Sequence, residues 1–295
     1  MSSATDATHP RFKENNNSNV MKVALVQMAV GSEKKLNIAE AVSQIHSAKE
    51  KGASLVVLPE CFNSPYGTQY FKEYAEEIPS GETCVALSKA ARETGLCIVG
   101  GSLPERDGGR LYNTSTVWDT TGTLIAKHRK LHLFDIDIPD KITFKESEVL
   151  TAGDKITTFK FNGVTIGIGI CYDLRFYEMA HIMAELGCSM LIYPAAFNMI
   201  TGPAHWEILG QARAIDNQLY VALVSPARDT KASYCAWGYT TMFDPWGDII
   251  GTLDHAPGVV MATVDFNKVG KIRASIPIRE QRRNDVYQTR LNNKM

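Results

Sequence analysis

A cysteine at the end of an apolar run is the residue of this chain that is best placed to do chemistry. Cys171 closes the β-branched stretch 164–170, and a helix-favouring segment begins just after it. Such a strand-to-helix turn holds a side chain at a sheet edge and points backbone N–H groups and the positive helix end toward it, which favours a thiolate. The pattern predicts a nucleophile, which needs a base and a group that stabilises an oxyanion.

Two further ionisable residues follow predicted strands. Glu60 comes directly after Leu58-Pro59, and Lys130 lies in the basic segment 127–134. Taken singly, each has an ordinary structural explanation: a solvated loop glutamate, a surface lysine and, for Cys171, a buried inert thiol. Because ligands bind at the carboxyl ends of parallel strands, we expect Glu60, Cys171 and segment 195–198 to share one sheet edge.

The elements that must position these residues alternate between strands and helices. Apolar runs and helical periodicity predict the following segments. Strands are expected at 22–27, 54–60, 97–101, 164–170, 189–194, 219–225 and 259–264, and helices at 37–51, 83–94, 177–186 and 206–217. Antiparallel hairpins are expected at 112–130, 158–170 and 238–251. The strand–helix–strand order of 22–60 recurs at 164–194, which indicates parallel βαβ units in a pseudo-symmetric α/β core.

Composition excludes several classes of function. The formal net charge of the 295 residues is −1, so we expect no nucleic-acid partner and no attraction to anionic membranes. No apolar run approaches the ~20 residues of a membrane span. The six cysteines are scattered, with no zinc or CxxC spacing, which favours reduced thiols and a cytoplasmic protein.

The polar residues 1–20 predict a disordered tail. They lack the amphipathic Arg- and Ser-rich pattern of a mitochondrial presequence, although a mitochondrial fraction stays open.

Together, the contexts of Glu60, Lys130 and Cys171 resemble the nitrilase superfamily, the carbon–nitrogen hydrolases, over residues 21–265. The three residues match its Glu-Lys-Cys triad, and Glu146 matches a second glutamate near its site. The resemblance implies an α–β–β–α sandwich that forms a homodimer with four layers. We expect the charged residues 266–295 to form an extension that packs on the domain or on the partner subunit.

The resemblance also implies roles for these residues. Cys171 would attack an amide carbon, while Lys130 and the backbone N–H of Tyr172 would hold the oxyanion. Glu60, partly desolvated, would carry the proton to the departing ammonia and then activate the water that hydrolyses a thioester on Cys171. Glu146 would position Lys130 or the substrate amine. Neither a metal nor a cofactor is expected; the partners would be a small amide and water.

Four loop segments resemble the ω-amidase branch of the superfamily, namely 58–67, 132–139, 197–206 and 225–229. This branch hydrolyses α-ketoglutaramate or α-ketosuccinamate to the keto-diacid and ammonia. A cation should receive the remote carboxylate of such substrates. Arg175 is the candidate, with Tyr66 and Thr201 as a polar wall; the alternative is that Arg175 makes a structural ion pair.

Other interpretations use the same residues. A Cys–His pair could involve a histidine, but no cysteine-protease signature accompanies Cys171; the candidates are His128, His132, His181 and His205. The spacing of His128 and His132 suits a metal only on a helix, whereas their segment predicts a strand and a loop. Gly167-x-Gly169 lacks the rest of a dinucleotide fingerprint. A nitrilase, a carbamoylase or a deaminated-glutathione amidase would use the same triad, and a catalytically silent scaffold would need none of it.

Overall fold

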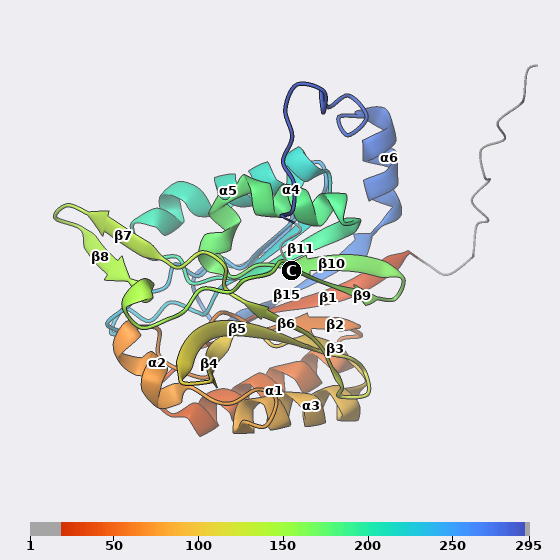
Figure 1. Cartoon of the computed structure of the whole chain (residues 1–295). Helices are drawn as coiled ribbons and strands as arrows, with labels where there is room; N and C mark the ends of the chain where they lie inside the picture. The colour runs from red at the N-terminus through yellow and green to blue at the C-terminus, as the bar shows by residue number, and fades with distance from the viewer. Residues whose placement is uncertain (1–18, 293–295) are drawn as a thin grey trace, which may run out of the picture.

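The computed structural model describes residues 19–292, in which two β-sheets lie face to face and helices cover both outer surfaces (Figure 1). This α–β–β–α arrangement is the one expected for a single chain. The first eighteen residues of the predicted N-terminal tail lie outside the described residues, and Val20 of that tail already belongs to the first strand.

The seven-stranded sheet has the order β15-β1-β2-β3-β5-β4, with β6 paired to β5. Its strands are β1 (Val20–Gln27), β2 (Leu55–Val57), β3 (Cys97–Val99), β4 (Leu103–Asp107), β5 (Arg110–Trp118), β6 (Leu124–Arg129) and β15 (Gly258–Asp265). β1, β2 and β3 are parallel, and β15 pairs antiparallel to β1. The helices α1 (Lys34–Glu50) and α3 (Glu82–Thr94) cover its outer face with Ile45 and Leu87 among their buried residues.

The six-stranded sheet has the order β14-β13-β12-β11-β10-β9. Its strands are β9 (Thr157–Phe161), β10 (Val164–Ile168), β11 (Cys188–Pro194), β12 (Tyr220–Val224), β13 (Thr241–Phe243) and β14 (Ile249–Thr252). β10, β11 and β12 are parallel, so each sheet carries three parallel strands, as the repeated pattern predicts. The helices α4 (Tyr177–Glu185) and α5 (Thr201–Asn217) cover its outer face.

The main core fills the space between the two sheets. Val23 and Leu25 of β1 point into it, whereas Ala24 and Val26 face the helical layer. This alternation follows from the two-residue repeat of a strand, and apolar residues on both faces are typical of a parallel strand buried on both sides. The apolar run of residues 23–26 therefore accounts for the burial of β1 on both of its faces.

The two predicted catalytic strand ends belong to different sheets. Glu60 follows β2 of the seven-stranded sheet, and Cys171 follows β10 of the six-stranded sheet. The expectation of a single shared sheet edge was therefore wrong. Both strands end on the same side of the sandwich, so the two side chains meet across the packed sheets. β2 also ends at Val57, three residues before Glu60, which leaves the glutamate on a loop.

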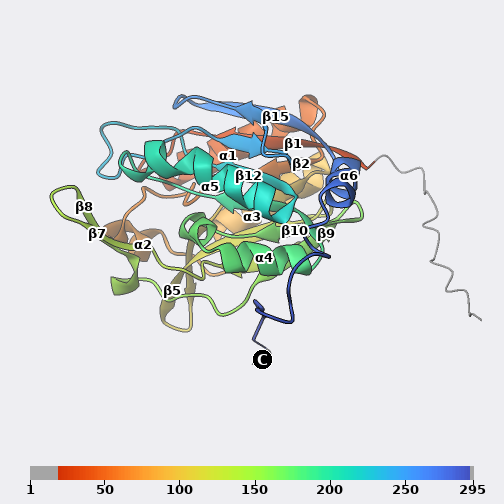
Figure 2. The same ribbon diagram turned by 90° about the horizontal axis from the view of Figure 1, so that it is seen from above.

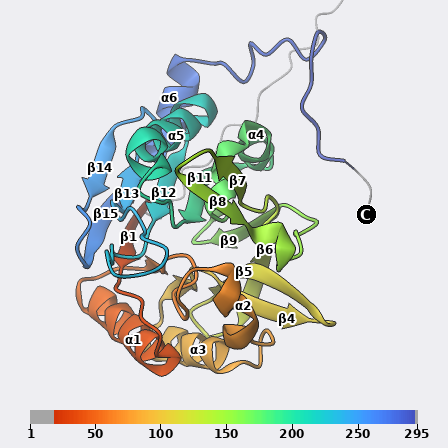
Figure 3. The ribbon, with the colours of Figure 1, turned by 90° about the vertical axis from the view of Figure 1, so that its left-hand side faces the viewer.

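Several elements were not predicted. They are β4, the short helix α2 (Thr68–Tyr74), and a separate two-stranded hairpin of β7 (Asp135–Ile138) and β8 (Ile142–Lys145). The hairpin forms no part of either sheet and projects from one end of the sandwich, at the left of Figure 1; Figure 3 views the molecule from that end. Two 3-10 turns, η1 (Glu146–Glu148) and η2 (Cys171–Arg175), hold predicted site residues. α5 begins at Thr201, five residues before its predicted start.

The C-terminal segment packs on the domain. α6 (Asn267–Ser275) and the chain after it run beside the helical layer of α4 and α5 (Figure 2). Arg279 donates to the carbonyl of Ala184, and Arg279 and Arg282 both pair with Glu185. Among the helices of residues 19–292, none is both long and apolar enough to span a membrane.

Candidate active site

Three charged side chains meet without solvent exposure at the carboxyl ends of β2 and β6. Lys130 Nζ lies 3.1 Å from Glu60 Oε1 and 2.9 Å from Glu146 Oε2. Lys130 is the first residue after β6, and its backbone N–H continues the strand pairing to Asn113 at 2.8 Å. The predicted grouping of Glu60, Lys130 and Glu146 therefore exists in the structure.

Two further contacts hold the carboxylate of Glu60. The Asn113 side-chain amide donates to Oε1 at 2.9 Å, and the backbone N–H of Ala196 donates to Oε2 at 2.7 Å. Asn113 lies on β5 of the first sheet, and Ala196 follows β11 of the second. Each sheet thus contributes a donor, so the packing of the sandwich determines the orientation of the carboxylate.

Cys171 opens the turn η2 directly after β10 and is 3% exposed. Its φ of 46° lies in the left-handed region, which non-glycine residues adopt rarely. Such a conformation persists only where the surrounding structure enforces it, and it is frequent at functional sites. Gly169, just before it, packs against the ring of Tyr193 where no Cβ would fit. The Cys171 side chain is therefore held in a strained, closely packed turn.

The surroundings of Cys171 act against the thiolate that a strand-to-helix turn alone would favour. Burial raises the pKa of Cys171 well above its usual range, and the neighbouring charge of Glu60 raises it further. Burial also raises the pKa of Glu60 above 4.5, with Lys130 opposing the rise and Glu146 adding to it. A carboxylate with a raised pKa beside a thiol is suited to accept its proton.

Lys130 keeps its proton in this environment. Burial would favour the neutral amine, but the charges of Glu146 and Glu60 raise the pKa of Lys130 well above its ordinary value. Glu146 in turn accepts a hydrogen bond from the Tyr66 hydroxyl at 2.8 Å and another from the Phe134 backbone N–H at 2.8 Å. The hydroxyl of Tyr66 thus orients the carboxylate of Glu146. Tyr66 also lines a cavity beside this cluster.

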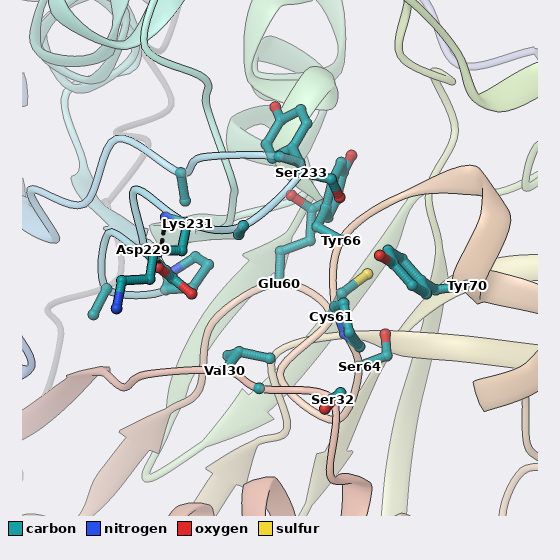
Figure 4. Close-up of a pocket in the computed structure, with 17 residues that line it drawn as sticks. Val30, Ser32, Glu60, Cys61, Ser64, Tyr66, Tyr70, Asp229, Lys231 and Ser233 are labelled. Atoms are coloured by element: carbon teal, nitrogen blue, oxygen red, sulfur yellow. Dashed lines mark hydrogen bonds between the residues drawn. The ribbon is translucent and has the colours of Figure 1, made fainter.

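A cavity of about 240 Å³ reaches this cluster from the loops that precede α1 and α2 and follow β12 (Figure 4). Glu60, Cys61, Tyr66 and Tyr234 are among its lining residues, and Lys231 lies at its rim. The volume is below the about 300–1,000 Å³ typical of drug-sized ligands and suits a substrate of few atoms. Cys171, Arg175 and Thr201 do not line it, so the cavity meets the cluster on the side of Glu60.

Comparison with known proteins identifies the family. The sequence profile of the carbon–nitrogen hydrolases matches residues 22–274. The chain belongs to this family. It is similar to the omega-amidase NIT2 of Xenopus tropicalis (53% identity) and of Homo sapiens (52% identity), each over 90% of this chain and 96% of the relative. Its fold resembles Saccharomyces cerevisiae Nit3, a member of branch 10 of the nitrilase superfamily, with a TM-score of 0.83 and 40% identity over 90% of this chain and 97% of that chain.

The protein is thus a hydrolase that acts on carbon–nitrogen bonds, an amidase of the nitrilase superfamily. The match extends nine residues beyond the predicted domain end at 265, because α6 is part of the matched region.

Arg175 of this hydrolase is a half-buried cation with aromatic neighbours. Its guanidinium lies 4.9 Å from the ring centroid of Phe197 and 5.6 Å from that of Tyr172, and Nη1 contacts His205 Nδ1 at 3.2 Å. Within residues 19–292 no carboxylate lies within ion-pair distance of it, so the alternative of a structural ion pair finds no partner there. Tyr172 also packs its ring on Phe134.

Thr201 has a structural partner instead of a free hydroxyl. Its Oγ1 and its backbone N–H both donate to Asn198 Oδ1, at 3.2 and 2.9 Å, at the start of α5. The role of Thr201 as a polar wall stays a prediction, and its hydroxyl proton is already donated to Asn198. The contact arises because α5 begins at Thr201, where the first backbone N–H groups need acceptors.

The four histidines considered as partners of the thiol have other contacts in the described chain. His128 and His132 bind Asp173 at 3.1 and 2.8 Å. His205 contacts Arg175, and His181 lies 3.5 Å from Arg282. No group of three or more His, Cys, Asp or Glu residues in residues 19–292 has the arrangement of a metal site.

Several residues that shape the site were missed in the sequence. Asn113 and Ala196 hold Glu60, and Tyr234 packs 4.5 Å from Tyr66 while its hydroxyl donates to the carbonyl of Ala196 at 2.6 Å. Asn113 sits in an otherwise apolar and hydroxyl-bearing strand, which is a signal for a buried polar contact. Tyr234 lies in an irregular loop, where no periodicity marks a buried side.

Proposed function

We propose that this hydrolase is an ω-amidase that converts small ω-amides, such as α-ketoglutaramate and α-ketosuccinamate, to the keto-diacid and ammonia. The observation that carries the proposal is the buried cluster of Glu60, Lys130 and Glu146 beside Cys171, in a chain 52–53% identical to proteins named omega-amidase. A catalytically silent scaffold would have no reason to bury three charged groups, whose desolvation is costly.

The first half-reaction forms a thioester. Glu60 accepts the thiol proton as the sulfur of Cys171 attacks the amide carbon, and a tetrahedral oxyanion forms. Lys130 and the backbone N–H of Tyr172 stabilise its charge; removing one such donor typically costs ~10²–10³ in turnover. The carbon–nitrogen bond then breaks, and the proton on Glu60 passes to the nitrogen, which leaves as ammonia.

The second half-reaction releases the acid. Glu60, again a carboxylate, accepts a proton from a water molecule whose oxygen attacks the thioester carbon. The second oxyanion meets the same donors, the carbon–sulfur bond breaks, and the proton returns from Glu60 to the sulfur of Cys171. Glu146 keeps the Lys130 ammonium in place through both steps, because its carboxylate is itself fixed by Tyr66 and Phe134.

Arg175 would bind the carboxylate at the remote end of the substrate. It lies four residues beyond the nucleophile and has no carboxylate partner of its own in the described chain. Losing one charge-assisted hydrogen bond corresponds to about 1.5–3 kcal/mol. Arg175→Ala should therefore raise KM for α-ketoglutaramate by roughly 10- to 100-fold with little change in kcat. Lys231→Ala, at the cavity rim, is the matched control; the assignment is wrong if only the lysine variant raises KM.

One assay distinguishes the proposed ω-amidase activity from the other reactions of the superfamily. Ammonia release is measured with α-ketoglutaramate, glutamine, a simple nitrile, a carbamoylated amino acid and deaminated glutathione, for the wild type and Cys171→Ala. We expect turnover of α-ketoglutaramate to dominate and to fall by more than about 10³-fold in the variant. Dominant turnover of another substrate would assign that reaction instead, and equal turnover by the variant would refute the role of Cys171.

We also propose that the enzyme is a cytoplasmic homodimer. Ile208 and Ile215 lie two turns apart on α5 and are 67% and 52% exposed, and Trp246 beyond β13 is 56% exposed. Exposed apolar residues gathered on one face are typical of a protein–protein contact. Pairing of two such faces would stack two sandwiches, with the helical layer of α5 in one subunit against the same layer of its partner. A cytoplasmic location accords with free cysteines throughout the described residues.

A further inference from the structure

The carboxylate of Asp173 is saturated with hydrogen bonds although it lies outside the triad. Oδ1 accepts from the backbone N–H of His132 at 2.9 Å and from His132 Nδ1 at 2.8 Å. Oδ2 pairs with His128 Nε2 at 3.1 Å and accepts from the backbone N–H of Ile170 at 2.9 Å. We call this carboxylate, with His128, His132 and Ile170, the Asp173 clasp.

The clasp is built as a permanent structure. Asp173 and His128 have no exposed surface, and His128 Nδ1 contacts the Thr157 hydroxyl at 3.2 Å, which fixes the ring from its other side. Burial alone would raise the pKa of Asp173, but the hydrogen bonds from His128 and His132 outweigh it and hold that pKa far below the usual range. A buried carboxylate is tolerated only when its acceptor sites are filled in this way.

The residues of the clasp flank the two catalytic groups in the chain. His128 and His132 lie two residues before and two residues after Lys130, and Ile170 and Asp173 enclose Cys171. The first segment spans the end of β6 in the seven-stranded sheet, with His128 inside the strand, and the second follows β10 of the six-stranded sheet. One side chain therefore connects the lysine segment and the cysteine turn across the sandwich.

The clasp also closes the turn that holds the thiol. The Asp173 backbone N–H donates to the carbonyl of Ile170 at 3.0 Å, while the Asp173 side chain accepts from the Ile170 N–H. These reciprocal bonds enclose Cys171 in its left-handed conformation, with φ of 46°. Without them, the turn would relax toward a more common backbone conformation and move the sulfur.

We propose that Asp173 is a positioning residue for catalysis: through His132 and Ile170 it fixes the Lys130 ammonium and the Cys171 thiol at one distance from each other. The proposal rests on the roles proposed above for Cys171 and Lys130. The hydrogen bonds of Asp173 go to His128, His132 and Ile170, so Asp173 acts on the two reacting groups through the two backbone segments. A shift of about 1 Å between reacting groups can cost roughly 10²-fold in rate.

His132 offers a matched pair of variants that tests this link. Its side chain is 31% exposed and stacks on Phe176, so its replacement should leave the fold intact. Asn places an N–H donor at the position of Nδ1, whereas Leu has nearly the same shape and no donor. We expect His132→Leu to lower kcat by roughly 10- to 100-fold at unchanged KM, and His132→Asn to retain most of the wild-type kcat.

A second readout does not require the proposed substrate. The rate of alkylation of Cys171 by iodoacetamide, followed by peptide mass spectrometry, should fall in His132→Leu and be restored in His132→Asn. If the wild type failed to release ammonia from α-ketoglutaramate, the proposed function would fail, while these alkylation rates would still test the clasp. Equal rates and equal kcat values for the two variants would overturn the clasp.

Asp173→Asn completes the test. The amide cannot accept from both His132 and Ile170 while also facing His128, so kcat should fall at least as much as in His132→Leu. Asp119→Asn is the control, because Asp119 also accepts from several groups, those of Thr121 and Thr123, at the other end of β6. The kcat of Asp119→Asn should match that of the wild type. A loss of kcat equal to that of Asp173→Asn would show that disturbing either end of β6 lowers kcat, which would contradict a specific role for Asp173.

Discussion

At the scale of single residues, burial beside two charged neighbours determines the direction in which the pKa of Glu60 shifts. Burial raises the pKa of Glu60 above 4.5, with Lys130 opposing and Glu146 adding to the rise. Because the carboxylate form is the base, kcat/KM should fall as the pH drops through this raised pKa. Stability has the opposite sign: the folded state prefers the protonated form, so ionisation of Glu60 costs stability as the pH rises through the same pKa.

Glu60→Gln separates these two effects. The amide is a neutral isostere, so kcat should fall by at least about 10²-fold because no base remains. The melting temperature at pH 7 should not fall, since the variant no longer buries an ionised carboxylate at this position. Activity assays and thermal melts across pH provide the measurement. Glu148→Gln, an exposed glutamate in the turn of Glu146, should change neither; a melting temperature for Glu60→Gln well below that of the wild type would contradict the argument.

Strand contexts marked Glu60 and Cys171 as residues at strand ends, but the resemblance to the carbon–nitrogen hydrolases was needed to add Lys130 and Glu146 to them. The strand argument placed Glu60 and Cys171 on one sheet edge, whereas they follow strands of two different sheets. Strand contexts were also not sufficient to predict protonation, since burial and the neighbouring charges, which a sequence does not display, raise the pKa of the Cys171 thiol. Asp173 was missed for a similar reason. A carboxylate two residues after a nucleophile looks like any loop aspartate until its four donors are brought to it by two sheets.

At the scale of elements, the loop that carries Glu60 depends on a glycine in the loop between β3 and β4. Gly101 has φ of +52°, and a Cβ there would overlap the carbonyl oxygen of Pro59, the residue before Glu60. Gly101→Ala should therefore displace the Glu60 loop. We expect the free energy of unfolding to fall by roughly 2–3 kcal/mol because of the clash and by about 1 kcal/mol more because of the left-handed backbone. We also expect a large fall in kcat.

Gly108→Ala is the control that isolates the clash. Gly108 has almost the same φ, +54°, but lies in the exposed turn between β4 and β5 with open space around it. The free energy of unfolding of Gly108→Ala should fall by only about 1 kcal/mol, and its kcat should equal that of the wild type. Chemical denaturation and ammonia release measure both quantities. Equal losses in the two variants would mean that the backbone conformation, and not the contact with Pro59, is the source of the effect.

Elements with a strong period were predicted, and those without one were not. The apolar runs of β1, β10 and β12 and the helices α1 and α3 appear close to their expected bounds. The β7–β8 hairpin was missed because its four-residue strands are half exposed and its partner is only the other strand of the pair. The early start of α5 was missed because its first residues, Thr201-Gly-Pro, are poor helix formers that Asn198 caps from outside the helix.

At the scale of the whole molecule, both helical layers expose apolar side chains. Leu36 on α1 and Val85 on α3 are 68% and 56% exposed, but they belong to different helices. Ile208 and Ile215 lie two turns apart on one helix, α5, and Trp246 in the turn between β13 and β14 is also exposed. Exposed apolar residues gathered on one face are typical of a protein–protein contact, which favours association through α5.

Association through α5 predicts the behaviour of two charge substitutions of equal chemistry. In sedimentation velocity at low micromolar concentration, the wild type should have twice the mass of one chain. Ile208→Asp should shift the protein to the mass of one chain, because two copies of the introduced carboxylate would meet in a desolvated contact about a two-fold axis. Leu36→Asp makes the same change at an equally exposed position on the opposite layer and should remain dimeric. A monomeric wild type would refute the dimer, and a dimeric Ile208→Asp would place the contact on a face other than α5.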